Sequence, residues 1–156
     1  MEQKIDYAQL QADALDVFHH GFACSESVIY ALRKNFGWTN LSDDAIAMST
    51  GFPWGLGGAG CLCGAVAGGT MCIGYMFGRR TQGDPCANKC HKLTCEFAEE
   101  VRKRFGATCC GKLIQEFPNR EMESRKAKCA DIVSFCVETA AHIIEREMGN
   151  QEQRRA

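Results

Sequence analysis

The sequence has almost no net charge, no N-terminal export signal and no long run of large aliphatic side chains. Its 18 lysines and arginines nearly balance its 19 aspartates and glutamates, for a formal charge of −1. This balance gives no electrostatic case for binding nucleic acid or an anionic membrane. Residues 1–6 lack the basic and apolar regions of a signal peptide. The longest apolar stretch, residues 59–77, is interrupted by glycines, which favours a buried helix over a membrane span. We therefore expect a cytoplasmic protein that binds neither nucleic acid nor a membrane.

The sequence also lacks the alternating pattern of strands and any internal repeat. Its 156 residues are enough for one domain with its own core. Apolar residues at helical spacing predict five helices, over about residues 5–20, 23–36, 63–77, 86–105 and 124–148. Shorter helical pieces are predicted after Ser42, a capping residue, and over residues 109–117. The sequence therefore predicts an all-α fold: a single-domain helical bundle of about five to seven helices over residues 1–148, with a Gly-rich loop before the central helix and a polar tail at residues 149–156.

Glycine and cysteine are concentrated in residues 55–72. A glycine inside a helix costs about 1 kcal/mol relative to alanine, so glycines here indicate a close approach of the backbone to another helix or to a bound group. Gly64 and Gly68 are one helical turn apart and would form a ridge of small residues against a neighbouring helix. Residues 55–60 also fit GxGxxG, but the dinucleotide fingerprint follows a strand. Because a helical segment and Pro53 precede the glycines here, we discount nucleotide binding.

Eleven cysteines are many for this length, and the odd number excludes a complete set of disulfides within one chain. A reducing compartment also disfavours disulfides, which leaves metal binding, redox chemistry or packing. Cys63 stands where the Gly-rich loop passes into the central helix. Unpaired N–H groups and the positive dipole end of a helix favour thiolate over thiol at that position. We therefore predict that Cys63 is a reactive or metal-ligating cysteine.

A second group of candidate ligands lies at the start of the predicted helix at residues 86–105. Cys86 and Cys90 are separated by one helical turn, and His91 follows them. The run is one residue longer than the C-x-x-C-H haem motif and has no export signal upstream, so haem is disfavoured. The two cysteines stay candidates for a shared metal ion, with His91 as the one histidine retained as a candidate ligand. Packing as ordinary thiols is an equal alternative.

Four cysteines stand in a characteristic order along the chain. One opens the second helix, one begins the sequence Cys-Gly-Ala-Val-Ala-Gly (CGAxxG), one precedes Gly-Lys-Leu-Ile, and one lies near the start of the last helix; they are Cys24, Cys63, Cys110 and Cys129. A Gly-Gly-Ala-Gly turn at residues 57–60 precedes CGAxxG. This pattern, from about residue 8 to residue 144, resembles the C_GCAxxG_C_C family of putative redox-active proteins.

The resemblance implies that these four cysteines carry the function and that they bind an iron–sulfur cluster. Cys110, rather than its neighbour Cys109, is aligned with the third cysteine of the pattern, because the apolar pair Leu113 and Ile114 then also matches the pattern. Each of the four is predicted at or near the start of a separate helix, where thiolate is favoured. Four thiolates from four helices supply the ligands of a cubane iron–sulfur cluster or of a closed zinc site.

Zinc is the weaker expectation for this ligand set. Structural zinc sites use short C-x₂₋₄-C pairs, which the four cysteines lack, and a helical domain of this size folds without zinc. Next to a cluster, the glycines of the preceding turn would let backbone N–H groups contact the cluster sulfurs. The predicted cofactor-binding glycines are Gly57, Gly58 and Gly60.

We therefore expect a redox-active, electron-transfer protein with an iron–sulfur cluster and an unidentified redox partner protein. Three alternatives stay open. The first is a metal-free thiol–disulfide protein with Cys63 as nucleophile and Cys24, Cys110 or Cys129 as the resolving cysteine, although the absence of C-x-x-C weakens it. The second is a non-catalytic metal-binding module, which the surplus cysteines favour. The third is a helical bundle, monomeric or homodimeric, with cysteines as core filler.

Overall fold

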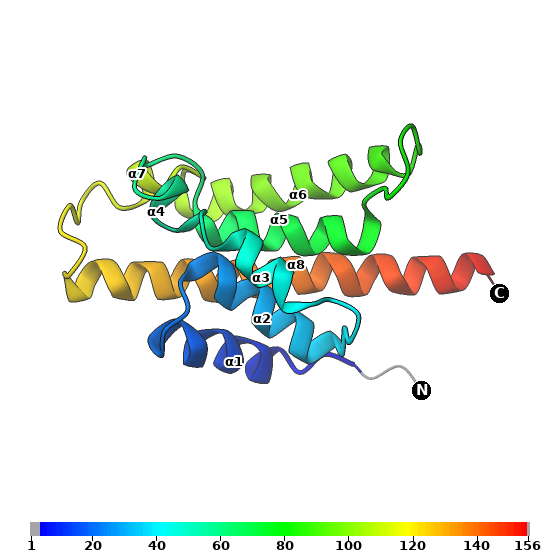
Figure 1. The fold of residues 1–156 in the computed structure, drawn as a ribbon, viewed down its shortest axis with the longest axis horizontal. Coiled ribbons are helices and arrows are strands. Elements are labelled where there is room, and N and C mark those ends of the chain that lie inside the picture. The colour runs from blue at the N-terminus through cyan, green and yellow to red at the C-terminus, as the bar shows by residue number, and fades with distance from the viewer. Residues whose placement is uncertain (1–3, 156) are drawn as a thin grey trace.

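The computed structural model describes residues 4–155 as a bundle of helices (Figure 1). In chain order the elements are α1 (Tyr7–His19), α2 (Cys24–Phe36), α3 (Asp43–Ser49), α4 (Pro53–Leu56), α5 (Gly64–Phe77), α6 (Ala87–Phe105), α7 (Cys110–Leu113) and α8 (Glu123–Arg155). The element α4 is a turn more than a helix, because Trp54 and Gly55 inside it have φ values of 64° and 65°. Seven helices then remain in the described residues, and the predicted all-α, single-domain fold is confirmed.

Most helix ends lie where the sequence predicts them. The Ser42 hydroxyl accepts a hydrogen bond from the Asp44 N–H at 3.3 Å and caps α3. Gly37 and Gly106 end α2 and α6 in the left-handed conformation, with φ values of 66° and 87°. Local signals therefore suffice to place these boundaries.

Two helices differ in length from the prediction. The helix α7 ends at Leu113 rather than near residue 117, because the backbone of Ile114 leaves the helical region (φ −113°, ψ 14°). The last helix, α8, continues to Arg155 instead of ending near Met148. Gly149 alone does not stop it, since the cost is only about 1 kcal/mol and the following glutamines and glutamate are good helix formers. Residues 1–3 and 156, which belong to the predicted domain and tail, lie outside the described residues.

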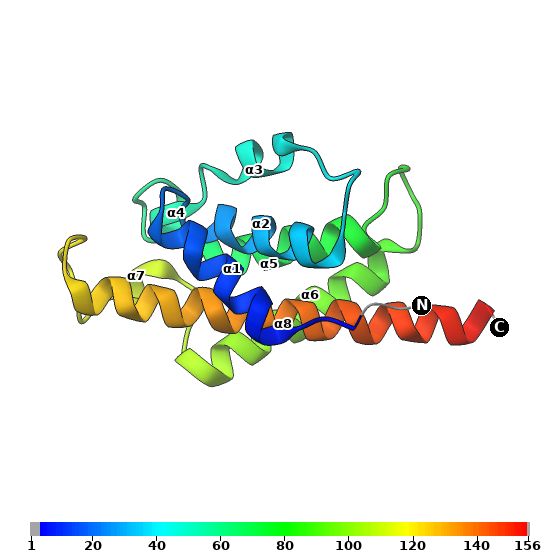
Figure 2. The ribbon, with the colours of Figure 1, turned by 90° about the horizontal axis from the view of Figure 1, so that it is seen from below.

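The central helix of the bundle is α5, which packs against α2, α6 and α8 (Figure 2). Its small residues allow these close contacts. A Cβ atom added at Gly68 would lie 2.6 Å from the backbone oxygen of Ser25 in α2, and one added at Gly69 would lie 2.5 Å from Cζ of Phe97 in α6. The predicted ridge of small residues is therefore confirmed as a helix-packing surface.

The helices α2, α5 and α8 run in one direction, and α1 and α6 run back (Figure 1). As a result, the N-terminal ends of three long helices gather at one end of the bundle, where α4 and α7 also lie. This end therefore collects the unpaired N–H groups of several helix starts. Among the helices of residues 4–155, none combines the length and apolar composition that crossing a bilayer requires.

The role of Gly68 in packing can be tested against Gly74 in the same helix. In Gly68→Ala the new methyl group collides with the α2 backbone, so we expect the free energy of unfolding to fall by about 1–3 kcal/mol. In Gly74→Ala the methyl group meets open space, so we expect a gain of about 0.5–1 kcal/mol from helix propensity. Urea midpoints at unchanged slope give both values. Equal stability of the two variants would contradict the packing role.

Candidate functional site

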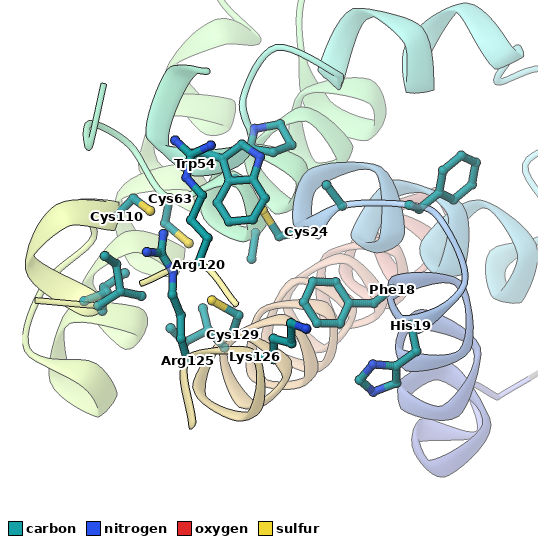
Figure 3. Close-up of a pocket in the computed structure, with 18 of the residues that line it drawn as sticks. Phe18, His19, Cys24, Trp54, Cys63, Cys110, Arg120, Arg125, Lys126 and Cys129 are labelled. Carbon is teal, nitrogen blue, oxygen red and sulfur yellow. The ribbon is translucent and has the colours of Figure 1, made fainter. Parts of the chain in front are cut away.

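A cavity of about 550 Å³ opens at the end of the bundle where the helix starts gather. Four of the eleven cysteines line it: Cys24, Cys63, Cys110 and Cys129. Their sulfur atoms point toward the same space from four different elements (Figure 3). The structure thus brings together the four cysteines that the sequence pattern groups. Cys110 faces the cavity, and its neighbour Cys109 is exposed and does not line it.

Three of the four cysteines occupy helix starts. Cys24 is the first residue of α2, Cys63 is the N-cap of α5, and Cys110 is the first residue of α7. Cys129 differs, because α8 begins at Glu123 and places Cys129 in its second turn. The helix starts bring backbone N–H groups close to sulfur at three of these positions.

A short antiparallel pairing holds Cys63 and Cys110 next to each other. Leu62 and Cys109 form an isolated β-bridge. On either side of it, the Cys110 N–H donates to the Cys61 oxygen at 2.6 Å, and the Cys63 N–H donates to the Thr108 oxygen at 2.9 Å. Nothing in the sequence signals this pairing, because one bridge has no periodic pattern. It nevertheless fixes the distance between the starts of α5 and α7.

The glycines of the preceding turn shape the backbone and do not line the cavity. Gly57, Gly58 and Gly60 have φ values of 67°, 111° and 72°, which side chains rarely adopt. Gly60 packs against Gly111, whose N–H donates to the Gly60 oxygen at 3.0 Å. The structure therefore does not place these three glycines around the cysteines, and their role as cofactor-binding residues stays a prediction.

Burial dominates the electrostatics of the four thiols. It raises the pKa of Cys24 to about 12 and that of Cys63 to about 11, and it also raises the pKa of Cys110 and Cys129. The Val66 and Ala65 N–H groups oppose this by lowering the pKa of Cys63, although they do not reach the geometry of a capping hydrogen bond. The expectation that a helix start makes Cys63 a thiolate is therefore wrong for this cavity, since desolvation outweighs the helix end.

The four thiols interact as one group. After burial, other cysteines of the group contribute to the raised pKa of Cys24, of Cys63 and of Cys129. Burial, and after it Cys63 and Cys24, raise the pKa of a fifth thiol, Cys136, which is fully buried and does not line the cavity. Within residues 4–155, however, no group of three or more Cys, His, Asp or Glu side chains lies close enough to enclose a metal ion. The four thiols therefore line a common cavity without forming a ligand set for a single metal ion.

The second group of candidate ligands lies away from this cavity. Cys86 and Cys90 are half-buried at the start of α6, and His91 is exposed. None of the three lines the cavity. Cys86 and Cys90 interact weakly, and no third ligand joins them in the described residues. Their role as a metal site remains a prediction.

Three further residues that line the cavity belong to no sequence pattern that marks a site: Trp54, Arg120 and Arg125. Arg120 Cζ lies 4.6 Å and Arg125 Cζ 5.4 Å from the centre of the Trp54 ring, within cation–π distance. Arg125 also lowers the pKa of Cys110 and Cys129, against the larger effect of burial. The cavity thus combines four thiols with two guanidinium groups (Figure 3).

Comparison with known proteins gives one match. A protein-family model described as "Putative redox-active protein (C_GCAxxG_C_C)" matches residues 22–143. This range contains all four cysteines of the cavity and leaves out α1. No curated protein and no solved structure matches the chain.

Gly55 offers a test of how the turn positions Cys110. A Cβ atom at Gly55 would lie 2.7 Å from Cys110 Cβ and 2.6 Å from the Cys61 nitrogen, whereas one at Gly57 meets open space. Both glycines have a positive φ, so alanine costs about 1–2 kcal/mol in either place. We expect Gly55→Ala to lose a further 1–3 kcal/mol or so from the collision. Urea unfolding compares the two variants, and equal losses would show that the turn does not press on Cys110.

Proposed function

Because the chain belongs to the C_GCAxxG_C_C family of putative redox-active proteins, we propose that Cys24, Cys63, Cys110 and Cys129 form its redox centre by holding an iron–sulfur cluster. The observation that carries this proposal is the convergence of the four thiols, from four elements, on one cavity. An iron–sulfur cluster bound by these thiolates would accept and donate single electrons, which makes electron transfer the function.

The spacing of the thiols favours a cluster over a single zinc ion. A tetrahedral zinc site needs its sulfur ligands about 2.3 Å from one ion, hence close to one another. The described cysteines do not come that close in any group of three. A cluster of several iron and sulfide ions holds its cysteine ligands farther apart than one ion does. The cavity lies among the four sulfurs and has room for such a group.

Nearby groups can stabilise the negative charge that the thiols acquire as ligands. The N–H groups of Ala65 and Val66 act on Cys63, and the Arg125 guanidinium acts on Cys110 and Cys129. Polar groups of this kind around ligating sulfurs tune the reduction potential of a centre. The same surroundings disfavour metal-free thiol–disulfide exchange, because the attacking species is a thiolate and burial raises the pKa of Cys63 to about 11.

The proposal is tested on protein purified without oxygen. We expect a brown protein with iron and acid-labile sulfide in near-stoichiometric amounts. In Cys63→Ser and Cys110→Ser we expect most of both to be lost, because each variant removes a proposed ligand. Cys109→Ser is the matched control: it changes the adjacent, exposed thiol and should keep its iron. Circular dichroism checks that each variant folds.

Other results would overturn the proposal in distinct ways. A colourless, metal-free protein with a two-electron thiol titration would favour the thiol–disulfide alternative. A colourless protein with one zinc ion per chain would favour a metal-binding module, and a Soret band would indicate haem. If Cys63→Ser and Cys110→Ser both retain full iron, the centre lies elsewhere in the chain.

A further inference from the structure

Arg125 is buried in the cavity wall without an anionic partner. The residue is only 6 % exposed, and its Nε atom has no hydrogen-bond partner among the described residues. Its Nη1 atom donates to the backbone oxygens of Phe117 and Pro118, both at 3.4 Å, and the side chain also interacts with the Cys129 thiol, whose pKa it lowers. A buried cation is costly unless a negative charge is nearby. The Arg125 side chain extends toward Cys110 and Cys129 (Figure 3).

A second arginine, Arg120, also lines the cavity and, like Arg125, lowers the pKa of Cys110. Trp54 contacts both, with Arg120 Cζ the nearer at 4.6 Å from the ring centre. Neither arginine forms an ion pair with a carboxylate among residues 4–155. Both positive charges therefore lie near the Trp54 ring, and an anion in the cavity would be attracted to both.

The carboxylates at the cavity rim do not supply that anion. Glu121 and Glu123 also line the cavity, and each lies 3.7 Å from Lys126 Nζ, which can offset only one of the two carboxylate charges. Because Arg120, Arg125 and Lys126 face only two carboxylates, Glu121 and Glu123, the cavity wall keeps one positive charge in excess.

We propose that Arg120 and Arg125 bind a small oxyanion inside the cavity, beside the four cysteines. The planar guanidinium matches the oxygen pairs of carboxylate, phosphate and similar groups, and it binds them with two hydrogen bonds. The cavity volume of about 550 Å³ falls within the range of small-molecule sites, roughly 300–1,000 Å³. This inference rests on the arginines and is independent of what the cysteines hold. Where it assigns a substrate class to the redox centre, a small oxygen-rich anion, it rests on the proposed function.

Trp54 provides the readout. The chain has two tryptophans, and Trp38 is a core residue between Phe36 and Tyr75. In a Trp38→Phe background, Trp54 alone reports on the site. Inorganic phosphate is titrated at constant ionic strength, with sodium chloride as the compensating salt, into both metal-free protein and protein purified without oxygen. We expect a saturable change in Trp54 fluorescence in both preparations.

Substitutions then separate the site from general charge effects. Arg125→Gln and Arg120→Gln should each weaken phosphate binding by about tenfold or more, because each removes a charge-assisted contact. Arg120 is exposed, so its variant is informative even if Arg125→Gln fails to fold. The matched control is Arg104→Gln, which removes an arginine packed over Phe105 in α6 and should leave the affinity unchanged.

Three results would overturn the inference: no saturable response, equal affinity in both site variants and the parent, or binding that disappears when the cysteine centre is loaded. The last result would mean that the arginines neutralise the centre itself. Iron and sulfide are measured in every preparation, which keeps the two proposals apart. Phosphate binding by a protein that contains no iron would contradict only the proposed cluster. Iron in a protein that does not bind phosphate would contradict only the proposed oxyanion site.

Discussion

The burial of four thiols around one cavity is the constraint on which the rest of this end of the molecule depends. Desolvation raises the pKa of each, so the thiols can share the space as neutral groups when no metal is bound. Yet helix-start N–H groups and the Arg125 guanidinium are placed to favour the charged form. The surroundings of the four thiols thus suit the neutral groups as well as the negative charge that they would carry as metal ligands.

Small residues make this arrangement sterically attainable. Gly68 and Gly69 let α2 and α6 approach α5. Gly64, the first residue of α5, packs against the sulfur of Cys24 in α2. Gly55 leaves space for Cys110. A larger side chain at these positions would push the cysteine-bearing elements apart, because packed interiors do not absorb even one added methyl group freely. Glycines of this stretch therefore help to set the distances between the cysteine-bearing elements.

The sequence predicts the helices and most of their ends, which depend on local signals, but not the contacts between segments that are distant in the chain. Apolar spacing and end signals such as Ser42, Gly37 and Gly106 predict the helices and most of their ends, because these signals act within one turn. The order of cysteines groups the four that line the cavity. The pairing of Leu62 with Cys109, the arginines on Trp54 and the high pKa of Cys63 have no such local pattern. They arise from segments far apart in the chain, and only the folded arrangement brings them together.

Arg125 links the two proposals through charge. It acts on Cys110 and Cys129 and also faces the space proposed for the oxyanion. An anion bound there would offset part of the positive charge that these two sulfurs experience, and negative charge gained by the sulfurs would weaken the hold on the anion. Because such coupling is reciprocal, the two effects have the same free energy. If both proposals hold, reduction of the centre and release of the anion favour each other, so one buried guanidinium would connect electron transfer to substrate binding.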